Sequence, residues 1–210
     1  MTPHAIFKRV SPRFRRRRIA DFTRLFKPTA QTRILDVGGY PQFWVDSGIK
    51  SQITVLNVHD VFVPESLRGQ CRGIIGDGTA LRFGDGEFDV VFSNSVIEHL
   101  GTWKRQQQFA KEVSRVGKSY YVQTPAYEFF IEPHYITPCI HWFSKPTQKR
   151  VMRNFTVWGW LSRPSREAVE STVEEIRLLR ASEFQELFPH AKIVRERFAG
   201  LTKSYVAVSI

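Results

Sequence analysis

The short proline-bracketed segment 130–138 carries three side chains that could do chemistry together. It places a carboxylate at Glu132, an imidazole at His134 and a phenol at Tyr135. An imidazole that titrates near neutrality can take a proton from a reacting group, and a nearby carboxylate can orient the ring. We therefore expect His134 to act as a general base, Glu132 to orient it and Tyr135 to contact the substrate. The alternative is a rigid loop whose polar groups satisfy backbone atoms.

Two further histidines are candidates for the same chemistry. His99 stands in the phrase Glu98-His99-Leu100, where it acts as a base or simply begins or caps a helix. His141 is followed by Trp142, and both could line the substrate pocket beside the segment 130–138.

Metal binding is the other chemistry that such residues suggest. Glu132, His134 and His141 follow no spacing typical of a particular metal. Cys71 and Cys139 form no Cys-x-x-Cys or Cys/His pattern with ligand spacing. We therefore expect no metal site.

A second group of residues stands where successive apolar runs end. Glycines there let the backbone turn tightly and approach a ligand, while carboxylates and amides accept or donate hydrogen bonds. Because the carboxyl ends of parallel strands meet along one crevice, these residues predict a ligand-binding site. The group consists of Asp36 with Gly38 and Gly39, then Asn57, then Asp77 with Gly78.

The elements that must position these residues alternate as in a parallel α/β sheet. Short apolar runs predict strands, and longer polar stretches between them predict helices. The expected strands are 33–37, 53–57, 73–75, 88–92, 119–123, 192–198 and 204–210, and the clearest helices are 103–116 and 181–188.

Residues 125–165 interrupt this alternation. The stretch is rich in proline and aromatic residues, and it follows the carboxyl end of a strand, where α/β proteins bind ligands. We expect a substrate-side insertion or lid within a single domain, 1–210. Its aromatic content favours core packing by default, or an apolar acceptor such as a lipid, isoprenoid or aromatic metabolite.

With these motifs in view, the chain resembles the class I S-adenosylmethionine (SAM)-dependent methyltransferases, specifically the type 11 small-molecule group. The matching segments are Ile34 to Gly39, Gly76 to Phe83 and Phe88 to Leu100, in the family's order and spacing. The resemblance implies a Rossmann-like α/β fold with a seven-stranded, mostly parallel sheet, an antiparallel last strand and helices on both faces. It also implies SAM as cofactor.

The resemblance assigns cofactor roles to the strand-end residues. Gly38 and Gly39 would pass under the methionine and ribose portion, with Asp36 near the amino group. Asn57 would hold the ribose. Asp77 would bind the adenine amine, and Gly78 with Thr79 would contact the adenine edge. Ser93 and Asn94 would lie beside the methionine end.

Two departures from the family pattern affect these assignments. Asn57 stands where the family usually has an acidic residue, a role that His59 or Asp60 could take if the strand runs longer. The third glycine of the loop is absent, since Tyr40-Pro41 follows Gly39, and only a short helix fits before the second strand.

Charge is concentrated at one end of the chain. Residues 1–33 carry ten Lys or Arg and one Asp, which is +9 of the net +11. Ser11 and Pro12 predict a helix start within the basic segment 1–30, and Lys27-Pro28 ends the pattern. This helix either packs on the domain with solvated arginines or forms a patch for anionic lipid, phosphate or nucleic acid.

Composition restricts the remaining choices. It excludes a disordered tail, a collagen-like repeat and a disulfide scaffold, and no run is long enough to span a membrane. Two thiols without a secretion signal favour a reducing, cytoplasmic location. The basic N-terminal helix adds possible association with a membrane surface.

These observations favour methylation of an oxygen on a small-molecule, sugar or lipid-linked acceptor. The alternatives are an RNA or DNA methyltransferase that uses the basic N-terminus, and a catalytically silent methyltransferase-like subunit. Against nucleic acid, Ser93 to Val96 stands where many amine-directed enzymes carry Asn-Pro-Pro-Tyr. Nucleic acid is therefore the less favoured partner.

Overall fold

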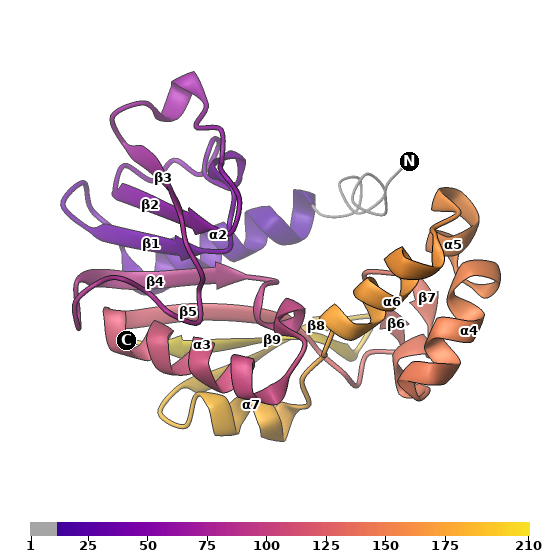
Figure 1. Ribbon diagram of the computed structural model, residues 1–210. Coiled ribbons are helices and arrows are strands. Elements are labelled where there is room, and N and C mark those ends of the chain that lie inside the picture. Colours follow the sequence, from indigo (N-terminus) through magenta and orange to yellow (C-terminus); the bar gives the residue numbers. More distant parts are fainter. Residues whose placement is uncertain (1–11) are drawn as a thin grey trace.

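The computed structural model describes residues 12–210, and its centre is a twisted seven-stranded sheet (Figure 1). Strand order is β3-β2-β1-β4-β5-β9-β8. β1 to β5 run parallel, while β9 is antiparallel to both β5 and β8. The expected sheet is therefore confirmed. Its strands are β1 Arg33–Val37, β2 Gln52–Asn57, β3 Cys71–Ile75, β4 Phe88–Asn94, β5 Gly117–Pro125, β8 Lys192–Phe198 and β9 Leu201–Ser209.

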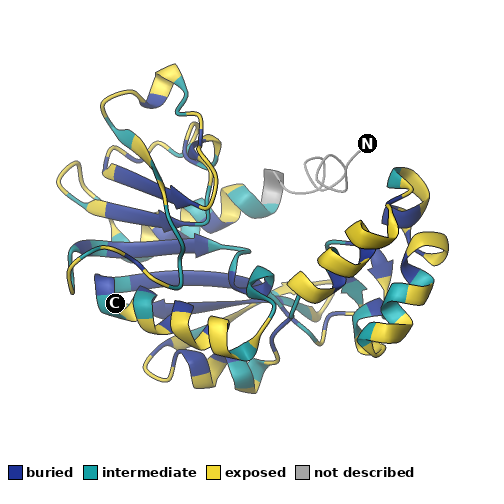
Figure 2. Cartoon of the chain, viewed as in Figure 1, coloured by how far each residue is buried: buried dark blue, intermediate teal, exposed yellow. Residues whose placement is uncertain are grey.

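Two cores form on opposite faces because successive side chains of a strand point to opposite sides. In β1, Leu35 packs into the core under helices α3 (Trp103–Val116) and α7 (Ala181–Leu187). Its neighbour Ile34 packs into the core under helix α2 (Pro12–Phe26). Figure 2 shows the sheet dark with buried residues between these helices.

Helix α2 covers the face of the sheet opposite α3 and α7. The link between β1 and β2 forms only a single 3-10 turn, η1 (Pro41–Phe43), which is shorter than the helix expected there. Phe22 of α2 is fully buried and contacts Trp44 and Phe92 edge-on, with ring centroids 5.9 and 5.3 Å apart. The expected helix cap, Ser11, lies outside the described residues.

Between β5 and α7 the chain builds a separate lobe beyond the carboxyl ends of the strands (Figure 1). It contains a small hairpin of β6 (Ile131–Glu132) and β7 (Thr137–Pro138) and three helices. The helices are α4 Lys145–Phe155, α5 Val157–Ser162 and α6 Arg166–Glu175, and a 3-10 turn η4 covers Ile140–Trp142. The lobe has its own core of Tyr135, Ile140, Met152, Trp158, Val169 and Val173.

Another 3-10 turn, η3 (Ile97–Leu100), follows β4 and lies where the sheet contacts this lobe. The buried Gln106 of α3 donates to the carbonyls of Ile97, at 3.0 Å, and Arg177, at 2.9 Å. The backbone N–H of Arg177 in turn donates to the Glu98 carbonyl at 2.8 Å. These bonds hold η3 between α3 and the segment after α6, and so fix where Glu98 and His99 point.

Candidate functional site

The glycine turn after β1 is packed so tightly that side chains are excluded. Gly38 has a φ of +77°, and a Cβ built there would lie 2.6 Å from the Val96 side chain. At Gly39, a Cβ would lie 1.9 Å from a carboxylate oxygen of Asp36. The turn therefore needs glycine at both positions, which is the close backbone approach expected of a cofactor loop.

Beneath this turn, the Asp36 carboxyl group is fully buried. Its Oδ2 accepts a hydrogen bond from the Trp44 indole N–H at 2.8 Å. Burial raises the pKa of Asp36 to about 7, although the bond from Trp44 opposes the shift. Its Oδ1 has no partner within the described part of the chain. An orphaned acceptor beside a bare glycine turn fits a ligand that brings an amine or ammonium group.

The side chain of Asn57 hydrogen-bonds to the backbone of the glycine turn. Its side-chain N–H donates to the carbonyl of Gly39 at 2.9 Å, and its Oδ1 accepts from the His59 backbone N–H at 3.3 Å. The predicted ribose role stays a prediction, because both polar atoms of the amide already have protein partners. His59 and Asp60, just beyond the strand, are exposed.

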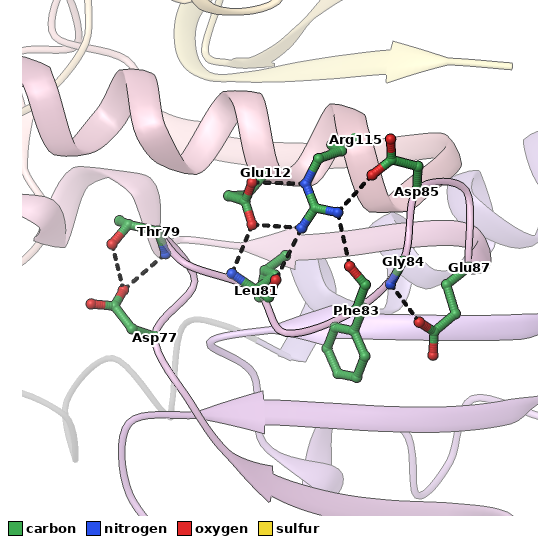
Figure 3. A network of polar contacts seen from close by, with 9 residues as sticks. All are labelled: Asp77, Thr79, Leu81, Phe83, Gly84, Asp85, Glu87, Glu112 and Arg115. Atoms are coloured by element: carbon green, nitrogen blue, oxygen red, sulfur yellow. Dashed lines mark hydrogen bonds and ion pairs between the residues drawn. The ribbon is translucent and has the colours of Figure 1, made fainter.

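The loop after β3 is held from the side by helix α3 (Figure 3). Arg115 donates to the carbonyls of Leu81 and Phe83, at 2.9 and 2.8 Å, and pairs with Glu112 and Asp85. This network fixes a loop that contains turns but no helix or strand.

At the start of the same loop, Asp77 folds a tight turn. Its Oδ1 accepts from the backbone N–H and hydroxyl of Thr79, both at 2.8 Å, and its Oδ2 pairs with Arg105 at 3.1 Å. Burial acts to raise its pKa, but the bonds from Thr79 and Arg105 outweigh burial and lower it. A Cβ at Gly78 would lie 2.8 Å from Val37, so this turn packs against the end of β1.

Ser93 and Asn94, at the end of β4, are both engaged. The buried Ser93 hydroxyl donates to the Val37 carbonyl at 3.0 Å. Asn94 Oδ1 accepts from the guanidinium of Arg18 at 2.8 Å. Arg18 is itself buried and pairs with Glu196 at 2.7 Å, so helix α2 reaches the end of β4. Arg18 was not predicted as a buried residue, because it lies in a run of four consecutive arginines, Arg15 to Arg18.

The structure brings the acid-base candidates of the lobe and the sheet into one chain of contacts. His134 Nδ1 lies 2.6 Å from Glu132 Oε1, and His134 Nε2 lies 3.1 Å from His99 Nε2. His99 Nδ1 lies 2.8 Å from Glu175 Oε1 at the end of α6. The two predicted bases thus form a histidine pair with a carboxylate at each end. Glu175 was not predicted as a site residue.

Electrostatics favour positive charge on His134. Burial acts to lower the pKa of His134, but the charge of Glu132 and its hydrogen bond outweigh burial and raise it. The hydrogen bond from His99 lowers the pKa of Glu175, which keeps that carboxyl ionised. A proton accepted by His134 is therefore stabilised by the neighbouring carboxylates.

Glu98 completes the cluster and was missed as a functional residue. Its side chain is fully buried; Oε2 accepts from the Thr124 hydroxyl at 3.0 Å, while Oε1 has no partner among the described residues. The signal in the sequence was the phrase Glu98-His99-Leu100, in which only His99 was predicted to act.

The three predicted substrate contacts have mixed surroundings. Tyr135 is buried in the core of the lobe and its hydroxyl donates to the Thr172 carbonyl at 3.2 Å, a supporting position. His141 and Trp142 both hydrogen-bond to the Tyr127 carbonyl, at 2.9 and 3.1 Å. Trp142 remains half exposed, and burial lowers the pKa of His141.

Part of the chain is similar to a known protein family. Residues 36–120, from the glycine turn to β5, match the model of a family described as a methyltransferase domain. No functionally curated protein matches the sequence.

Solved structures show the same fold at low identity. A SAM-dependent methyltransferase from Aquifex aeolicus shares 14% identity over 99% of this chain and 97% of its own, with a TM-score of 0.53. A Rhodobacter sphaeroides protein assigned as a Zn-dependent alcohol dehydrogenase reaches a TM-score of 0.60, at 15% identity over 91% and 88% of the two chains. A Nostoc punctiforme protein assigned as an O-methyltransferase reaches 0.57, at 11% identity over 95% and 56%.

Proposed function

Because this chain carries a class I SAM-dependent methyltransferase domain, we propose that it transfers the methyl group to an oxygen of its acceptor. The acceptor in this proposal is a small molecule, a sugar or a lipid-linked intermediate. One observation carries the proposal: a histidine pair, backed by two carboxylates, lies just beyond the end of β4. A hydroxyl acceptor has a proton to lose, and this pair can take it.

The cofactor supplies a methyl group on a sulfonium that is already activated, so the protein's main task is positioning. The glycine turn at Gly38 and Gly39 admits a ligand close to the backbone, and Asp36 offers a free acceptor under it. The turn at Asp77 and Thr79 presents a second polar edge, which α3 holds in place. We propose that these residues bind SAM.

Proton transfer falls to the histidine pair. With Glu132 and Glu175 each accepting a hydrogen bond from an Nδ1–H group, both Nε2 atoms carry lone pairs, and these face each other at 3.1 Å. One proton from the substrate hydroxyl can be held between them. The proton that leaves the acceptor is then shared between His134 and His99, and the carboxylates stabilise the cation. Methylation of the resulting oxygen removes its charge.

The surface of the lobe supports an apolar or lipid-linked acceptor. Phe155, Val157, Trp160 and Leu161, on and beside α5, are between 42% and 72% exposed. Arg150, Arg153 and Arg163 are exposed around them. Aromatic side chains beside arginines are typical of surfaces that dock on anionic membranes.

We propose that this surface makes peripheral contact with a membrane. The exposed Arg16, Arg17 and Arg24 of α2 contribute further positive charge to this contact. No helix in the described part of the chain could span a bilayer.

A labelling experiment tests the acceptor class. The chain is incubated with methyl-labelled SAM and a cell extract, which is then sorted into lipid, glycan, small-molecule and RNA fractions. We expect label in one of the first three fractions, and none with Asp77→Ala. Label found in RNA alone would contradict the proposed acceptor, whereas no SAM binding up to millimolar concentration would indicate a silent subunit.

A further inference from the structure

The Glu98–His99–His134 cluster has the composition and geometry of a metal site. One ligand atom from each of the three residues lies within 4.8 Å of the other two. Two imidazoles and one carboxylate are the donor set of catalytic zinc and of non-haem iron sites. We propose that this cluster binds a divalent transition-metal ion of the zinc type, held by both Nε2 atoms and a Glu98 oxygen.

The outer nitrogens of both histidines are held as in metal-binding proteins. His134 Nδ1 contacts Glu132 at 2.6 Å, and His99 Nδ1 contacts Glu175 at 2.8 Å. Carboxylates in this position fix the tautomer of a metal-binding histidine and turn its other nitrogen toward the ion. Here two such carboxylate–histidine pairs converge on one point from different elements, β6 and α6.

The separation of the two inner nitrogens suits a bound cation. When both Nδ1 atoms carry their protons toward the carboxylates, the Nε2 lone pairs of His99 and His134 face each other at 3.1 Å. A shared proton or a metal ion relieves that repulsion. Two nitrogens bound to tetrahedral zinc lie about 3.3 Å apart, close to the separation already present.

Glu98 provides an independent sign that something binds here. Its side chain is fully buried, and Oε1 has no hydrogen-bond partner anywhere among the described residues. A buried carboxylate oxygen without a donor is costly, and a bound cation satisfies it. The backbone of η3 is fixed by Gln106 and Arg177, and a carboxylate oxygen of Glu98 lies within 4.8 Å of the histidine ligand atoms.

One side of the cluster is open. The side chains of His99 and Glu175 are 35% and 50% exposed, whereas Glu98 is fully buried. A site with three protein ligands and an accessible fourth position is of the catalytic kind. Its use in catalysis rests on the proposed function: with both Nε2 atoms on the ion, the ion would bind the acceptor oxygen and make its hydroxyl more acidic, and the released proton would pass to solvent at the open side of the site.

Metal binding can be measured without an acceptor. Tag-free, chelator-treated chain is titrated with Zn²⁺ by calorimetry and with Co²⁺ by visible absorption. We expect one ion per chain, with a dissociation constant of about 1 μM or lower and the intense Co²⁺ bands of a four-coordinate site.

Variants of the cluster should bind the ion less tightly. His99→Ala and His134→Ala should weaken binding by about 100-fold. Glu175→Gln should weaken it by about 10-fold, because it removes only an orienting partner. His190→Ala, an exposed histidine outside the cluster, should bind as the wild type does.

Two results would overturn the metal site: no uptake of either ion by the wild-type chain, or equal uptake by all the histidine variants. SAM binding to the same metal-free preparation separates this proposal from the proposed function. Retained SAM binding without metal binding rejects the metal site alone, while loss of SAM binding by folded wild-type chain counts against the methyltransferase. The half-exposed Glu175→Gln variant should fold normally, so its weaker binding cannot be attributed to unfolding.

Discussion

Asp36 lies in an environment very different from that of a free side chain. It is buried between β1 and the glycine turn, with one oxygen bonded to Trp44 and the other without a partner in the described residues. The position of this carboxyl was predicted because Asp-x-Gly-Gly at a strand end is a local pattern. The partner Trp44 was not, since nothing in the sequence indicates that an indole eight positions later folds back onto it.

The raised pKa of Asp36 predicts that the free energy of unfolding depends on pH. Its pKa rises from 3.8 to about 7 on folding, so the folded state holds a proton that the unfolded state releases above pH 4. Its contribution to stability is therefore fully present below pH 4 and is lost as the pH rises through 7. Over that range the loss reaches up to about 4 kcal/mol.

Replacement by asparagine isolates this effect. Urea unfolding at pH 5 and pH 8 should show Asp36→Asn losing less stability on the alkaline side than the wild type, since it has no carboxyl to ionise. Asp46→Asn, an exposed aspartate in the loop that follows, serves as control. A wild type and Asp36→Asn with parallel pH profiles would show that Asp36 does not titrate in this way.

Helix α2 shows how an element can have a different use from the one its composition suggests. The arginine run reads as a surface for anions, and Arg16 and Arg17 are indeed exposed. Arg18 instead turns inward, where it binds Glu196 on β8 and Asn94 on β4. Which arginine faces inward depends on helix phase and on partners far along the chain, so composition alone could not predict it.

Arg18 should therefore contribute to stability as its neighbours do not. Arg18→Ala leaves Glu196 largely buried without its partner, and we expect a loss of about 3 kcal/mol in the free energy of unfolding. The control Arg17→Ala removes an exposed arginine and should cost less than about 0.5 kcal/mol. Equal losses in urea titrations of the two variants would contradict the assigned role of Arg18.

Restoring charge balance provides a second check on the same pair. In the double variant Arg18→Met with Glu196→Gln no charge is buried, so it should recover much of the stability lost in Arg18→Ala. A double variant no more stable than Arg18→Ala would show that the ion pair is not the cause of the loss.

The lobe was the least predictable element. Strands β1 to β5 follow apolar periodicity, and helix α3 was expected at its observed bounds because its pattern is strong. The lobe combines short helices, many prolines and a small core of its own, none of which gives a periodic signal. Its meeting with η3, which joins His134 to His99, depends on the whole fold.

Membrane docking by the lobe can be measured directly. Phe155→Ala and Trp160→Ala should each weaken binding to phosphatidylserine-containing vesicles by about 10-fold, since each removes a large exposed apolar side chain. Phe198→Ala, an exposed phenylalanine on β8, is the matched control. Sedimentation with vesicles at two salt concentrations is the measurement. Unchanged binding in both lobe variants would exclude this surface as the docking site.

At the scale of the whole molecule, binding and chemistry occupy different parts. The strand ends of β1 to β4 carry the residues proposed for the cofactor, and the contact between η3 and the lobe carries the acid-base cluster. The sheet could be predicted because each strand is a local pattern. The cluster could be predicted only in part, because Glu132 and His134 are neighbours in sequence while His99 lies 35 positions from His134.

Methyl transfer by His134→Ala, set against its SAM binding, tests the central claim most directly. With the acceptor fraction identified by labelling, we predict that turnover falls by about 100-fold or more, the usual contribution of a general base. SAM affinity, measured by calorimetry on the same protein, should stay within about threefold of the wild type because His134 lies outside the strand-end residues. Full turnover in the His134→Ala variant would contradict the account.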